Sequence, residues 1–329
     1  MVPILLYHGF TDKSRHDGIE NYHGKHLYIK RFEEQLIYLK KNYNIISLAQ
    51  LMAFYVEGKP LPRHPVLITI DDGYRSNYSL AFPVLKEHQA PACIFVATDF
   101  IDQKSCLWVD RLEYAFSKTE KTSLGLDLGG QKHHFDLNSM QARKETDKRV
   151  KSILKAMPSV EAARAVDGIE EQAQQALSMA AGDEIYAPLS WEQIREMQAS
   201  GFVTIGSHTC SHPILAHCPE EKIKSELAQS RRRIEEKTQV PCDYFSYPNG
   251  QKGDFNNAVK AQLIASGYKC ALTTMIGTNG LKTDHYELKR LNIHNSGDLG
   301  GFKRSLSGFG RFLRAIKNGS FFRAQLAQY

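Results

Sequence analysis

The stretch Val66-Leu67-Ile68-Thr69-Ile70-Asp71-Asp72-Gly73-Tyr74 is the most informative part of this chain of 329 residues. Five residues typical of a buried strand, 66–70, end abruptly at two adjacent carboxylates and a glycine. The end of a strand holds charge rigidly, and the glycine allows the chain to turn away at once. Successive strand residues point to opposite sides, so one aspartate can bind metal while the other accepts a proton. Asp-Asp-Gly is also a common turn, which is the alternative, structural interpretation.

A second apolar run, Phe202-Val203-Thr204-Ile205-Gly206, leads into Ser207-His208-Thr209-Cys210-Ser211-His212. His208 and His212 are four residues apart, close enough to bind one ion, and Pro213 disfavours helix at His212. One carboxylate with two imidazoles is the ligand set of an open, catalytic divalent-metal site. Zinc fits this set, and Co, Ni, Mn or Fe fit it too, because these ligand types do not select a single metal.

Short apolar runs alternate with amphipathic segments of helical length over most of the chain. This alternation predicts a parallel sheet, open or closed into a barrel. In such barrels the chemistry lies at the carboxyl ends of the strands, which is where His8, Asp71, Asp72, His208 and Tyr247 fall. The expected strands are residues 3–8, 44–47, 66–70, 92–97, 202–206, 243–247, 269–274 and 288–294.

The alternation stops between residues 103 and 187. Residues 141–181 are polar and rich in helix formers, so we interpret 103–187 as a mostly helical insertion. It is either a solvated cap or a lid that shapes a substrate groove. The last segment, 300–329, contains six Lys and Arg residues, no acidic residue and many interleaved Phe and Leu residues. It predicts either a basic amphipathic helix on an anionic membrane surface or a final helix packed on the barrel.

The composition is that of an ordinary soluble globular protein, with 42% hydrophobic and 24% charged residues. The net charge of +6 is modest and argues against a general nucleic-acid binder. No basic leader and no apolar run long enough to span a bilayer are visible. The six cysteines form no Cys-x-x-Cys pair, which favours reduced thiols. We therefore expect a cytoplasmic location, in contact with the inner membrane face if the tail docks there.

The two motifs, in this order and on these strand ends, resemble those of the polysaccharide deacetylases (carbohydrate esterase family 4, the NodB homology domain). The flanking residues 91–96 and Leu189-Ser190-Trp191 are similar as well. The resemblance covers residues 3–100 and 186–295. It implies a distorted (β/α) barrel of seven or eight strands over 1–299, interrupted by the insertion and followed by the tail. It also implies metal-dependent hydrolysis of the N-acetyl group of an N-acetylhexosamine in a polysaccharide or glycan precursor.

The resemblance further implies roles for single residues. Asp71 matches the general base, and the metal ligands would be Asp72, His208 and His212. Residues 244–250, Tyr-Phe-Ser-Tyr-Pro-Asn-Gly, resemble a third motif that lines the groove and lends a backbone N–H to the oxyanion. The expected substrate contacts are therefore Tyr247, Pro248 and Asn249, together with Tyr74, although both tyrosines are also readily explained as core residues.

Leu6-Tyr7-His8 resembles a further motif whose histidine is the general acid. Its N-terminal position is similar to that in circularly permuted deacetylases acting on poly-N-acetylglucosamine, so His8 can serve only if the two ends of the barrel meet. Ser246 stands where the family carries an arginine, and we expect Arg290 to supply the missing guanidinium and to contact substrate. His294 is a second candidate for the acid.

Alternative functions stay open at this point. The missing arginine suggests a glycan-binding module that kept the fold and lost the reaction, and a deacylase of another amide is also compatible. A two-histidine, one-carboxylate iron oxygenase would share the ligand set, but it needs no second aspartate beside the ligand. The expected partner is a carbohydrate, with no nucleic acid and with a membrane contact through 300–329 only.

Overall fold

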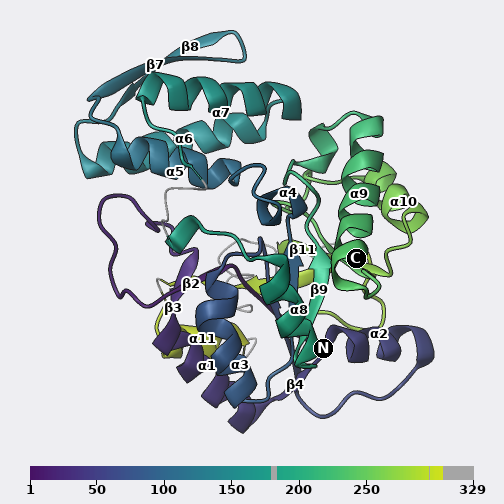
Figure 1. Ribbon diagram of the computed structural model, residues 1–329. Coiled ribbons are helices and arrows are strands. Elements are labelled where there is room, and N and C mark those ends of the chain that lie inside the picture. The colour runs from purple at the N-terminus through teal and green to yellow at the C-terminus, as the bar shows by residue number, and fades with distance from the viewer. Residues whose placement is uncertain (179–183, 296, 307–329) are drawn as a thin grey trace, which may run out of the picture.

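The computed structural model describes residues 1–178, 184–295 and 297–306. Its main sheet has eight parallel strands, in the spatial order β1-β12-β11-β10-β9-β6-β5-β4 (Figure 1). An additional pairing of β1 with β5 closes seven of these strands into a barrel. The strands are β1 (Ile4–Tyr7), β4 (Asn44–Ile46), β5 (Pro65–Ile70), β6 (Ala92–Val96), β9 (Val203–Ser207), β10 (Tyr244–Ser246), β11 (Cys270–Ile276) and β12 (Leu288–Asn292).

The predicted barrel of the (β/α) type is confirmed, and each of the eight expected apolar runs forms a strand. The strand β4 stands outside the closed ring. It pairs with the first residues of β5, and β1 pairs with the last residues of β5 along the same edge of that strand. Because β1 lies between β12 and β5, the N-terminal strand closes the barrel and brings the two ends of the chain's core together.

Helices cover the outside of the barrel. Ser190 begins one of them with the expected capping box, in which its side chain accepts a hydrogen bond from the Gln193 N–H. The helices are α1 (Ile29–Asn42), α2 (Leu48–Glu57), α3 (Phe82–Glu87), α4 (Thr98–Ile101), α8 (Trp191–Ala199), α9 (Glu220–Thr238), α10 (Asn257–Ala265) and α11 (Leu299–Leu306). Short elements complete this part: β2 (Gly9–Thr11), β3 (His26–Tyr28), a π-helical turn (Asn77–Ala81) and two 3₁₀ turns (Glu184–Tyr186 and Leu215–His217).

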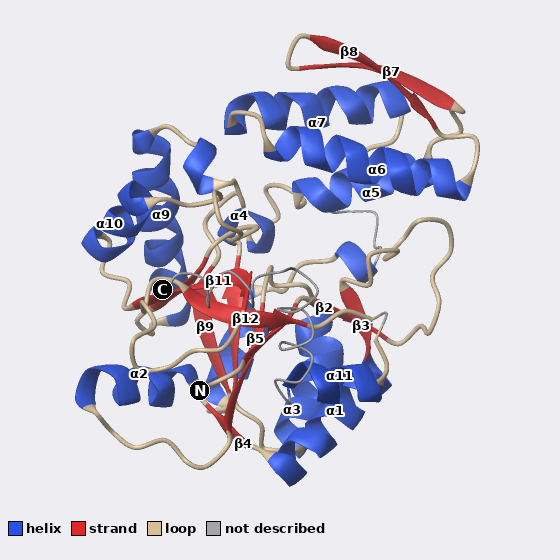
Figure 2. Ribbon diagram, turned by 180° about the vertical axis from the view of Figure 1, so that it is seen from behind, coloured by secondary structure: helices blue, strands red, loops and turns tan. Residues whose placement is uncertain are grey.

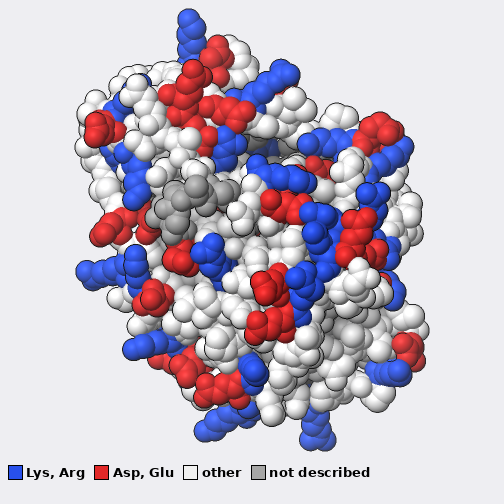
Figure 3. Space-filling view, in the orientation of Figure 1, with Lys and Arg blue, Asp and Glu red and all other residues white. Residues whose placement is uncertain are grey.

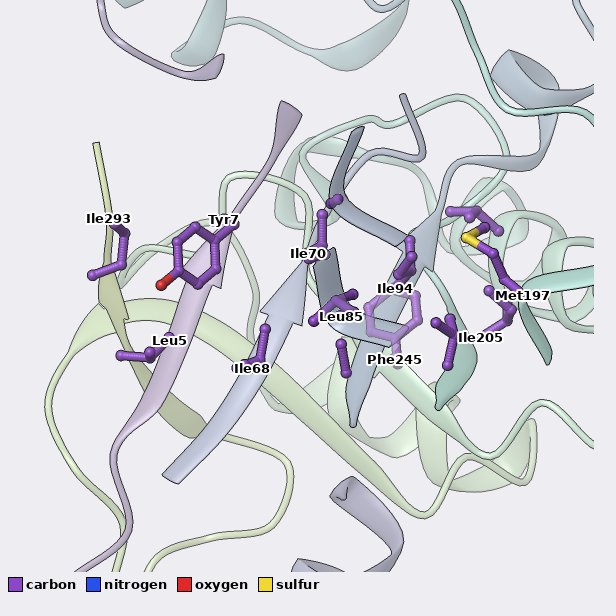
Figure 4. Close-up of a cluster of buried hydrophobic side chains, with 14 of the residues drawn as sticks. Leu5, Tyr7, Ile68, Ile70, Leu85, Ile94, Met197, Ile205, Phe245 and Ile293 are labelled. Carbon is purple, nitrogen blue, oxygen red and sulfur yellow. The ribbon is translucent and has the colours of Figure 1, made fainter. Parts of the chain in front are cut away.

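The core is divided by the alternation of side chains along each strand. One set faces the helices, as Ile68 and Ile70 do where they pack near Leu85 of α3 (Figure 4). The other set, which includes Leu67 and Phe95, forms a separate cluster with residues of α2. Asp71 continues the alternation of Leu67 and Thr69, so its carboxylate is placed at the mouth of the barrel interior.

Gly206 on β9 shows how tightly this interior is filled. A Cβ atom at this position would lie 2.5 Å from the Phe95 ring and 2.9 Å from the Tyr244 carbonyl oxygen. Neither the ring nor the neighbouring backbone leaves room for a methyl group, so glycine is required here by close approach. The strand that carries the histidine motif is therefore packed directly against the aromatic core.

The insertion forms a layer at the end of the barrel where the strands finish (Figures 1 and 2). It consists of α5 (Trp108–Lys118), β7 (Ser123–Leu128), β8 (Gln131–Asp136), α6 (Met140–Lys155) and α7 (Ser159–Ala173). It has its own hydrophobic cluster, which includes Phe116, Val150 and Val166. The antiparallel hairpin β7–β8 was not anticipated from the sequence. Its turn is made by Gly129 and Gly130, with φ of 64° and 77°, values that glycine adopts readily.

The start of the basic tail belongs to α11. Phe302 and Leu306 of this helix are buried, and the Phe302 ring meets Tyr38 of α1 with ring centroids 6.2 Å apart. Residues 307–329, on which the expectation of membrane contact mainly rests, lie outside the described residues. None of the helices within the described ranges has both the length and the apolar character to cross a bilayer. Positive and negative side chains are interspersed on the face seen in Figure 3.

Candidate metal and catalytic site

Three residues from two distant segments of the sequence come together beyond the ends of β5 and β9. The ligand atoms of Asp72, His208 and His212 all lie within 4.8 Å of one another, and the three residues are buried. Asp72 Oδ1 is 3.5 Å from His208 Nε2 and 3.6 Å from His212 Nε2. With bonds of about 2.0–2.2 Å to zinc, adjacent ligand atoms of a tetrahedral site are about 3.3–3.6 Å apart. The residues therefore fit a divalent ion, because these distances are too long for hydrogen bonds and suit shared coordination.

The backbone at this site is strained. Asp72, Thr209 and His212 have φ of 78°, 69° and 57°, in the left-handed region that non-glycine residues seldom adopt. Gly73, with φ of 93°, completes the turn after β5. Strained residues of this kind concentrate at functional sites, because the surrounding structure must hold them.

A hydrogen bond orients His208. Its Nδ1 lies 2.7 Å from the carbonyl oxygen of Ser246 on β10. A carbonyl can only accept, so Nδ1 carries the proton and the lone pair of Nε2 is directed toward Asp72. His212 Nδ1, in contrast, is buried without a hydrogen-bond partner among the described residues.

Glu226 of α9 holds the loop that connects the two histidines. Its Oε2 accepts hydrogen bonds from the backbone N–H groups of Cys210 and Ser211, at 2.8 and 2.9 Å. Its Oε1 accepts a third from the Ser211 hydroxyl at 2.5 Å. This carboxylate is itself buried. The loop geometry, and with it the placement of His212, therefore depends on a residue from another element.

We expect Glu226→Ala to weaken metal binding about 10- to 100-fold, the usual loss when a partner that orients metal ligands is removed. The cause is the loss of the acceptor that fixes the backbone N–H groups of Cys210, which is buried, and of Ser211. Metal affinity would be measured by competition with a chromogenic chelator. Glu221→Ala is the matched control, because Glu221 is an exposed residue of the same helix whose partner is Lys224. Equal metal affinity in both variants would contradict this positioning role.

Asp71 is bound by a guanidinium from the opposite end of the sequence. Arg290 of β12 donates from Nη1 to Asp71 Oδ1 at 2.8 Å and from Nη2 to Asp71 Oδ2 at 2.7 Å. Ser246 also donates to Oδ2, at 3.0 Å. Burial by itself would raise the pKa of Asp71, but the positive charge of Arg290, with a smaller contribution from His208, outweighs it and holds the pKa well below its ordinary value. Asp71 is therefore a carboxylate at neutral pH.

The expected contact between Arg290 and the base is thus present. The guanidinium missing from the third motif, which suggested a non-catalytic module, comes instead from β12. The Arg290 side chain is fully buried, and it also donates to the Thr273 carbonyl oxygen at 2.7 Å. The expectation that Arg290 contacts substrate is wrong, because its donors are directed to Asp71 and to other groups of the barrel.

Asp72 has a different electrostatic environment. Burial raises the pKa of Asp72 to about 7, the nearby ammonium of Lys25 opposes this shift, and the carboxylates of Asp71 and Asp110 add to it. Lys25 donates to the Tyr74 hydroxyl at 2.6 Å and to Asp110 of α5. Tyr74 donates to Asp110 Oδ2 at 2.7 Å. A group of charges from three segments therefore surrounds the candidate metal ligand.

His8 lies at the end of β1, next to Asp71, the candidate base. Asp71 donates its backbone N–H to the Tyr7 carbonyl oxygen at 2.9 Å, and the His8 carbonyl accepts a hydrogen bond from Asn77. The residue as a whole is partly exposed, whereas its imidazole is surrounded by protein. Burial lowers the pKa of His8 to about 3, with the negative charge of Asp71 opposing this shift, so the free imidazole is neutral at neutral pH. His294, the second candidate acid, is exposed beyond β12.

Two tyrosines expected at the substrate groove are core residues instead. Tyr74 is 0% exposed and Tyr247 1%. The Tyr247 hydroxyl donates to the Tyr286 carbonyl oxygen, and its ring is stacked on Phe255 at 4.2 Å between centroids. Neither ring can stack on a sugar in this arrangement, because the aromatic faces are covered by protein.

Of the other two expected substrate contacts in the third motif, Asn249 is the accessible one. Pro248 is buried, whereas Asn249 is partly exposed and has a φ of 59°. The Asn249 side-chain Nδ2 is a buried atom without a hydrogen-bond partner among the described residues. Of the expected substrate contacts, Asn249 is the one with an unused donor.

Lys25, Asp110 and Glu226 were missed at the sequence level. Glu226 had a detectable signal, because it lies three residues after Ile223 and next to Leu227, on the apolar side of α9. A charged residue on such a face needs a buried partner. Lys25 and Asp110 stand in segments without clear periodicity, and only the fold brings them together.

The sequence was compared with family models and with known proteins, and the matches agree on one family. The sequence model of a family described as polysaccharide deacetylase matches residues 58–271, more than half of the chain. This range contains Asp71, Asp72, His208 and His212, whereas His8 and Arg290 lie outside it. The Bacillus subtilis (strain 168) protein YxkH, a polysaccharide deacetylase by name, is 23% identical over 319 residues, 96% of this chain and 77% of that protein.

Two further similarities are more limited. A poly-beta-1,6-N-acetyl-D-glucosamine N-deacetylase of Escherichia coli (strain K12) is 45% identical over 60 residues, 18% of this chain and 9% of that protein. Among solved structures, the Streptococcus pyogenes deacetylase PplD, determined in complex with acetate, superposes with a TM-score of 0.62 at 16% identity. That match covers 93% of this chain and 97% of PplD. At 16% identity, it shows a similar fold and nothing further.

Proposed function

The chain belongs to the polysaccharide deacetylase family, and from this premise we propose that it hydrolyses the N-acetyl group of an N-acetylhexosamine within a polysaccharide or glycan precursor, releasing acetate, with a divalent metal ion as cofactor. Membership of the family makes the chain a hydrolase of amide bonds in carbohydrates. The choice of an N-acetylhexosamine is supported by the name of the E. coli relative. Zinc is the proposed metal, with Co, Ni, Mn and Fe as alternatives.

The observation that carries the proposal is the convergence of the two aspartates. Asp72 is directed to two imidazole nitrogens at 3.5 and 3.6 Å. The adjacent Asp71 is turned to Arg290 and keeps a carboxylate oxygen 3.9 Å from His208 Nε2. One carboxylate is therefore available as a metal ligand and the other, ionised and unligated, as a base beside the same place.

Asp72, His208 and His212 would hold the ion, and when bound it supplies Lewis-acid activation of the amide and of a water molecule. Asp71 takes a proton from the attacking water at one of its carboxylate oxygens. Arg290 and Ser246 keep this carboxylate in place and ionised, so the base needs no reorganisation before it acts. The water oxygen bonds to the carbonyl carbon as the proton leaves for Asp71.

Charge develops on the former carbonyl oxygen, and in this proposal a backbone N–H near Asn249 donates a hydrogen bond to it. The C–N bond then breaks, and His8 delivers a proton to the departing nitrogen, leaving acetate and an amine. Because the free His8 imidazole is neutral, this role requires that it gains its proton as negative charge builds up in the site. His294 is the competing donor.

We expect His8→Gln to lower the rate of acetate release about 10²-fold, the lower end of the range for a general acid. His8 is partly exposed, so water can replace part of its function. His294→Gln, an exposed residue, is the matched control and should keep nearly all activity. Rates would be measured by coupled acetate detection. The reverse pattern would assign the acid to His294.

The proposed function is tested with the full chain, stripped of metal by a chelator and then supplied with zinc or another divalent ion. Substrates are N-acetylglucosamine oligomers with β-1,4 or β-1,6 linkages. We expect acetate release to disappear on stripping and to return with about one equivalent of metal. Acetate release that persists in fully stripped protein, or no release with any of the metals and oligomers, would overturn the proposal.

The tail carries a separate hypothesis, that residues 300–329 dock on an anionic membrane surface at the inner membrane face, with the protein otherwise cytoplasmic. Within the described part, the apolar side of α11 is covered by α1, so the hypothesis depends on 307–329. We expect the full chain to float with vesicles that contain anionic lipid and to stay unbound with neutral ones. No flotation with anionic vesicles at low salt would remove it.

A further inference from the structure

We propose that Asp110 of the insertion is a positioning residue for the candidate metal site. It fixes the ammonium of Lys25 and the hydroxyl of Tyr74 beside Asp72, and so keeps the Asp72 carboxylate available to the ion. This inference rests on the proposed function, because it concerns the same metal site. It gives the insertion a part in that site, in addition to any role as a cap or a lid.

Asp110, Lys25 and Tyr74 form a closed group of hydrogen bonds. Lys25 donates from Nζ to the Tyr74 hydroxyl at 2.6 Å and also to Asp110 Oδ1. Tyr74 donates its hydroxyl proton to Asp110 Oδ2 at 2.7 Å. The Lys25 ammonium also lies 4.8 Å from the centre of the Tyr74 ring, within the range of a cation–π contact. Both carboxylate oxygens of Asp110 are thus used to fix the other two side chains.

The three members of this group come from three segments of the chain. Lys25 stands directly before β3, Tyr74 belongs to the turn after β5, and Asp110 lies in the first turn of α5. Asp110 and Tyr74 are buried. Tyr74 follows Asp72 by two residues, so the group joins the insertion to the turn that carries the candidate metal ligand.

The charges of this group act on Asp72. Burial raises the pKa of Asp72 to about 7, the Lys25 ammonium is the largest opposing influence, and the Asp110 carboxylate acts with burial. An ammonium this close to a buried carboxylate pairs with it when no other partner is present. Such a pair would compete with a divalent ion for the oxygens of Asp72. The bonds to Asp110 hold the ammonium elsewhere and cancel its charge.

Backbone hydrogen bonds explain the path of the turn but not this arrangement of charges. Gly73 accepts a hydrogen bond from the Leu189 N–H at 2.9 Å, and Asp72 accepts one from the Ala97 N–H at 3.2 Å. These bonds hold the strained backbone whether or not Asp110 is present. Asp110 adds the placement of the side chains around the Asp72 carboxylate, so its loss should change metal affinity without changing the path of the turn.

A second tyrosine–carboxylate pair on α5 provides a matched control. Tyr186 donates to Glu113 Oε1 at 2.9 Å, and the same oxygen accepts from the Asn21 N–H at 3.0 Å. Tyr186 and Glu113 are buried. Among the described residues, no hydrogen bond joins this pair to Lys25 or Tyr74. Tyr186→Phe therefore removes a buried hydroxyl bonded to a carboxylate of α5, as Tyr74→Phe does, but away from the metal site.

The test measures the zinc Kd of the metal-stripped full chain by competition with a chromogenic chelator. We expect Asp110→Asn to raise the zinc Kd about 10- to 100-fold, the usual loss when a residue that orients a metal ligand is removed. Lys25→Met added to Asp110→Asn should recover most of this loss, because the released ammonium is then absent. Tyr74→Phe should raise the Kd about 3- to 10-fold, the value of one hydrogen bond, and Tyr186→Phe should leave it unchanged.

Urea unfolding of the metal-free proteins separates positioning from general loss of structure. Tyr74→Phe and Tyr186→Phe each remove one buried hydroxyl bond, so we expect similar decreases in the urea midpoint. Their zinc affinities should nevertheless differ. If Asp110→Asn does not fold, this pair of tyrosine variants decides the question.

An unchanged zinc Kd in folded Asp110→Asn, or equal Kd values in the two tyrosine variants, would overturn the inference. A loss of affinity that Lys25→Met does not recover would also overturn it, since Asp110 would then act only by holding the fold. Failure of the proposed function looks different. Zinc binding that depends on Asp110, with no acetate release from any oligomer, would remove the proposed reaction and keep the positioning role.

Discussion

Asp71→Asn should lower the rate of acetate release by a factor of about 10² to 10⁴, the usual contribution of a positioned general base. The carboxylate of Asp71 is ionised because Arg290 donates two hydrogen bonds to it, at 2.7 and 2.8 Å. An asparagine of nearly the same shape still accepts one of these bonds but cannot take a proton from water. The measurement is kcat on a soluble N-acetylglucosamine oligomer, with the same metal content confirmed in both proteins.

The metal content separates the two aspartates. Asp72→Asn is the informative companion, because Asp72 is the residue directed to both imidazoles. We expect it to lose metal, whereas Asp71→Asn keeps it. If Asp71→Asn lost the metal and Asp72→Asn kept both metal and structure, the two roles would have to be exchanged.

Arg290→Met should destabilise the folded chain by about 3–5 kcal/mol, the usual cost of removing one partner from a buried ion pair. The Arg290 side chain is 0% exposed, and its guanidinium binds Asp71, Ser246 and the Thr273 carbonyl. Without it, a carboxylate remains buried in the barrel with no opposite charge bound to it. The free energy of unfolding in urea measures this effect, with the mutation compared in metal-free protein so that bound metal does not stabilise the native state.

The double variant Asp71→Asn with Arg290→Met is the control. Since it removes both charges, it should be more stable than Arg290→Met alone, and the two substitutions should be clearly non-additive. Lys132→Met, an exposed basic residue on β8, controls for the loss of a cation and should change stability by less than about 0.5 kcal/mol. Additive effects at 71 and 290 would show that their ion pair contributes little.

Much of the fold could be predicted from local patterns. The eight apolar runs became the eight strands of the main sheet, because a period of two or a short buried run is legible over a few residues. The hairpin β7–β8 was missed, although Leu124, Leu126 and Leu128 alternate before the pair Gly129-Gly130, which is a hairpin signal. The segments before and after this hairpin are rich in helix formers, so we interpreted the whole region as mostly helical.

The candidate metal ligands could be predicted from the sequence, whereas the residues that pack around them could not. Asp72 and His208 follow the apolar strands β5 and β9, and His212 lies in the loop after β9. The carboxyl ends of these two strands, with β6 between them, therefore bring the three residues together. The two tyrosines were wrongly expected at the groove, since a strand-end motif does not say which side chains the insertion and the outer helices cover. Lys25 and Asp110 carry no local signal, and their contact depends on how the insertion sits on the barrel.

The residue types and their order were therefore enough to predict a parallel sheet, open or closed into a barrel, and a candidate metal-ligating set with a spare carboxylate, because periodicity and ligand chemistry act over short distances along the chain. The choice of a (β/α) barrel came from the resemblance of the motifs to those of a known family. Other features depended on contacts between distant segments. They are the binding of Arg290 to Asp71, the hydrogen bonds from the histidine loop to Glu226, and the pocket lined by Trp108 and His212. Asp71 and Arg290 are separated by 219 positions. No periodicity spans such a distance, and closure of the barrel by β1 against β12 and β5 creates the contact.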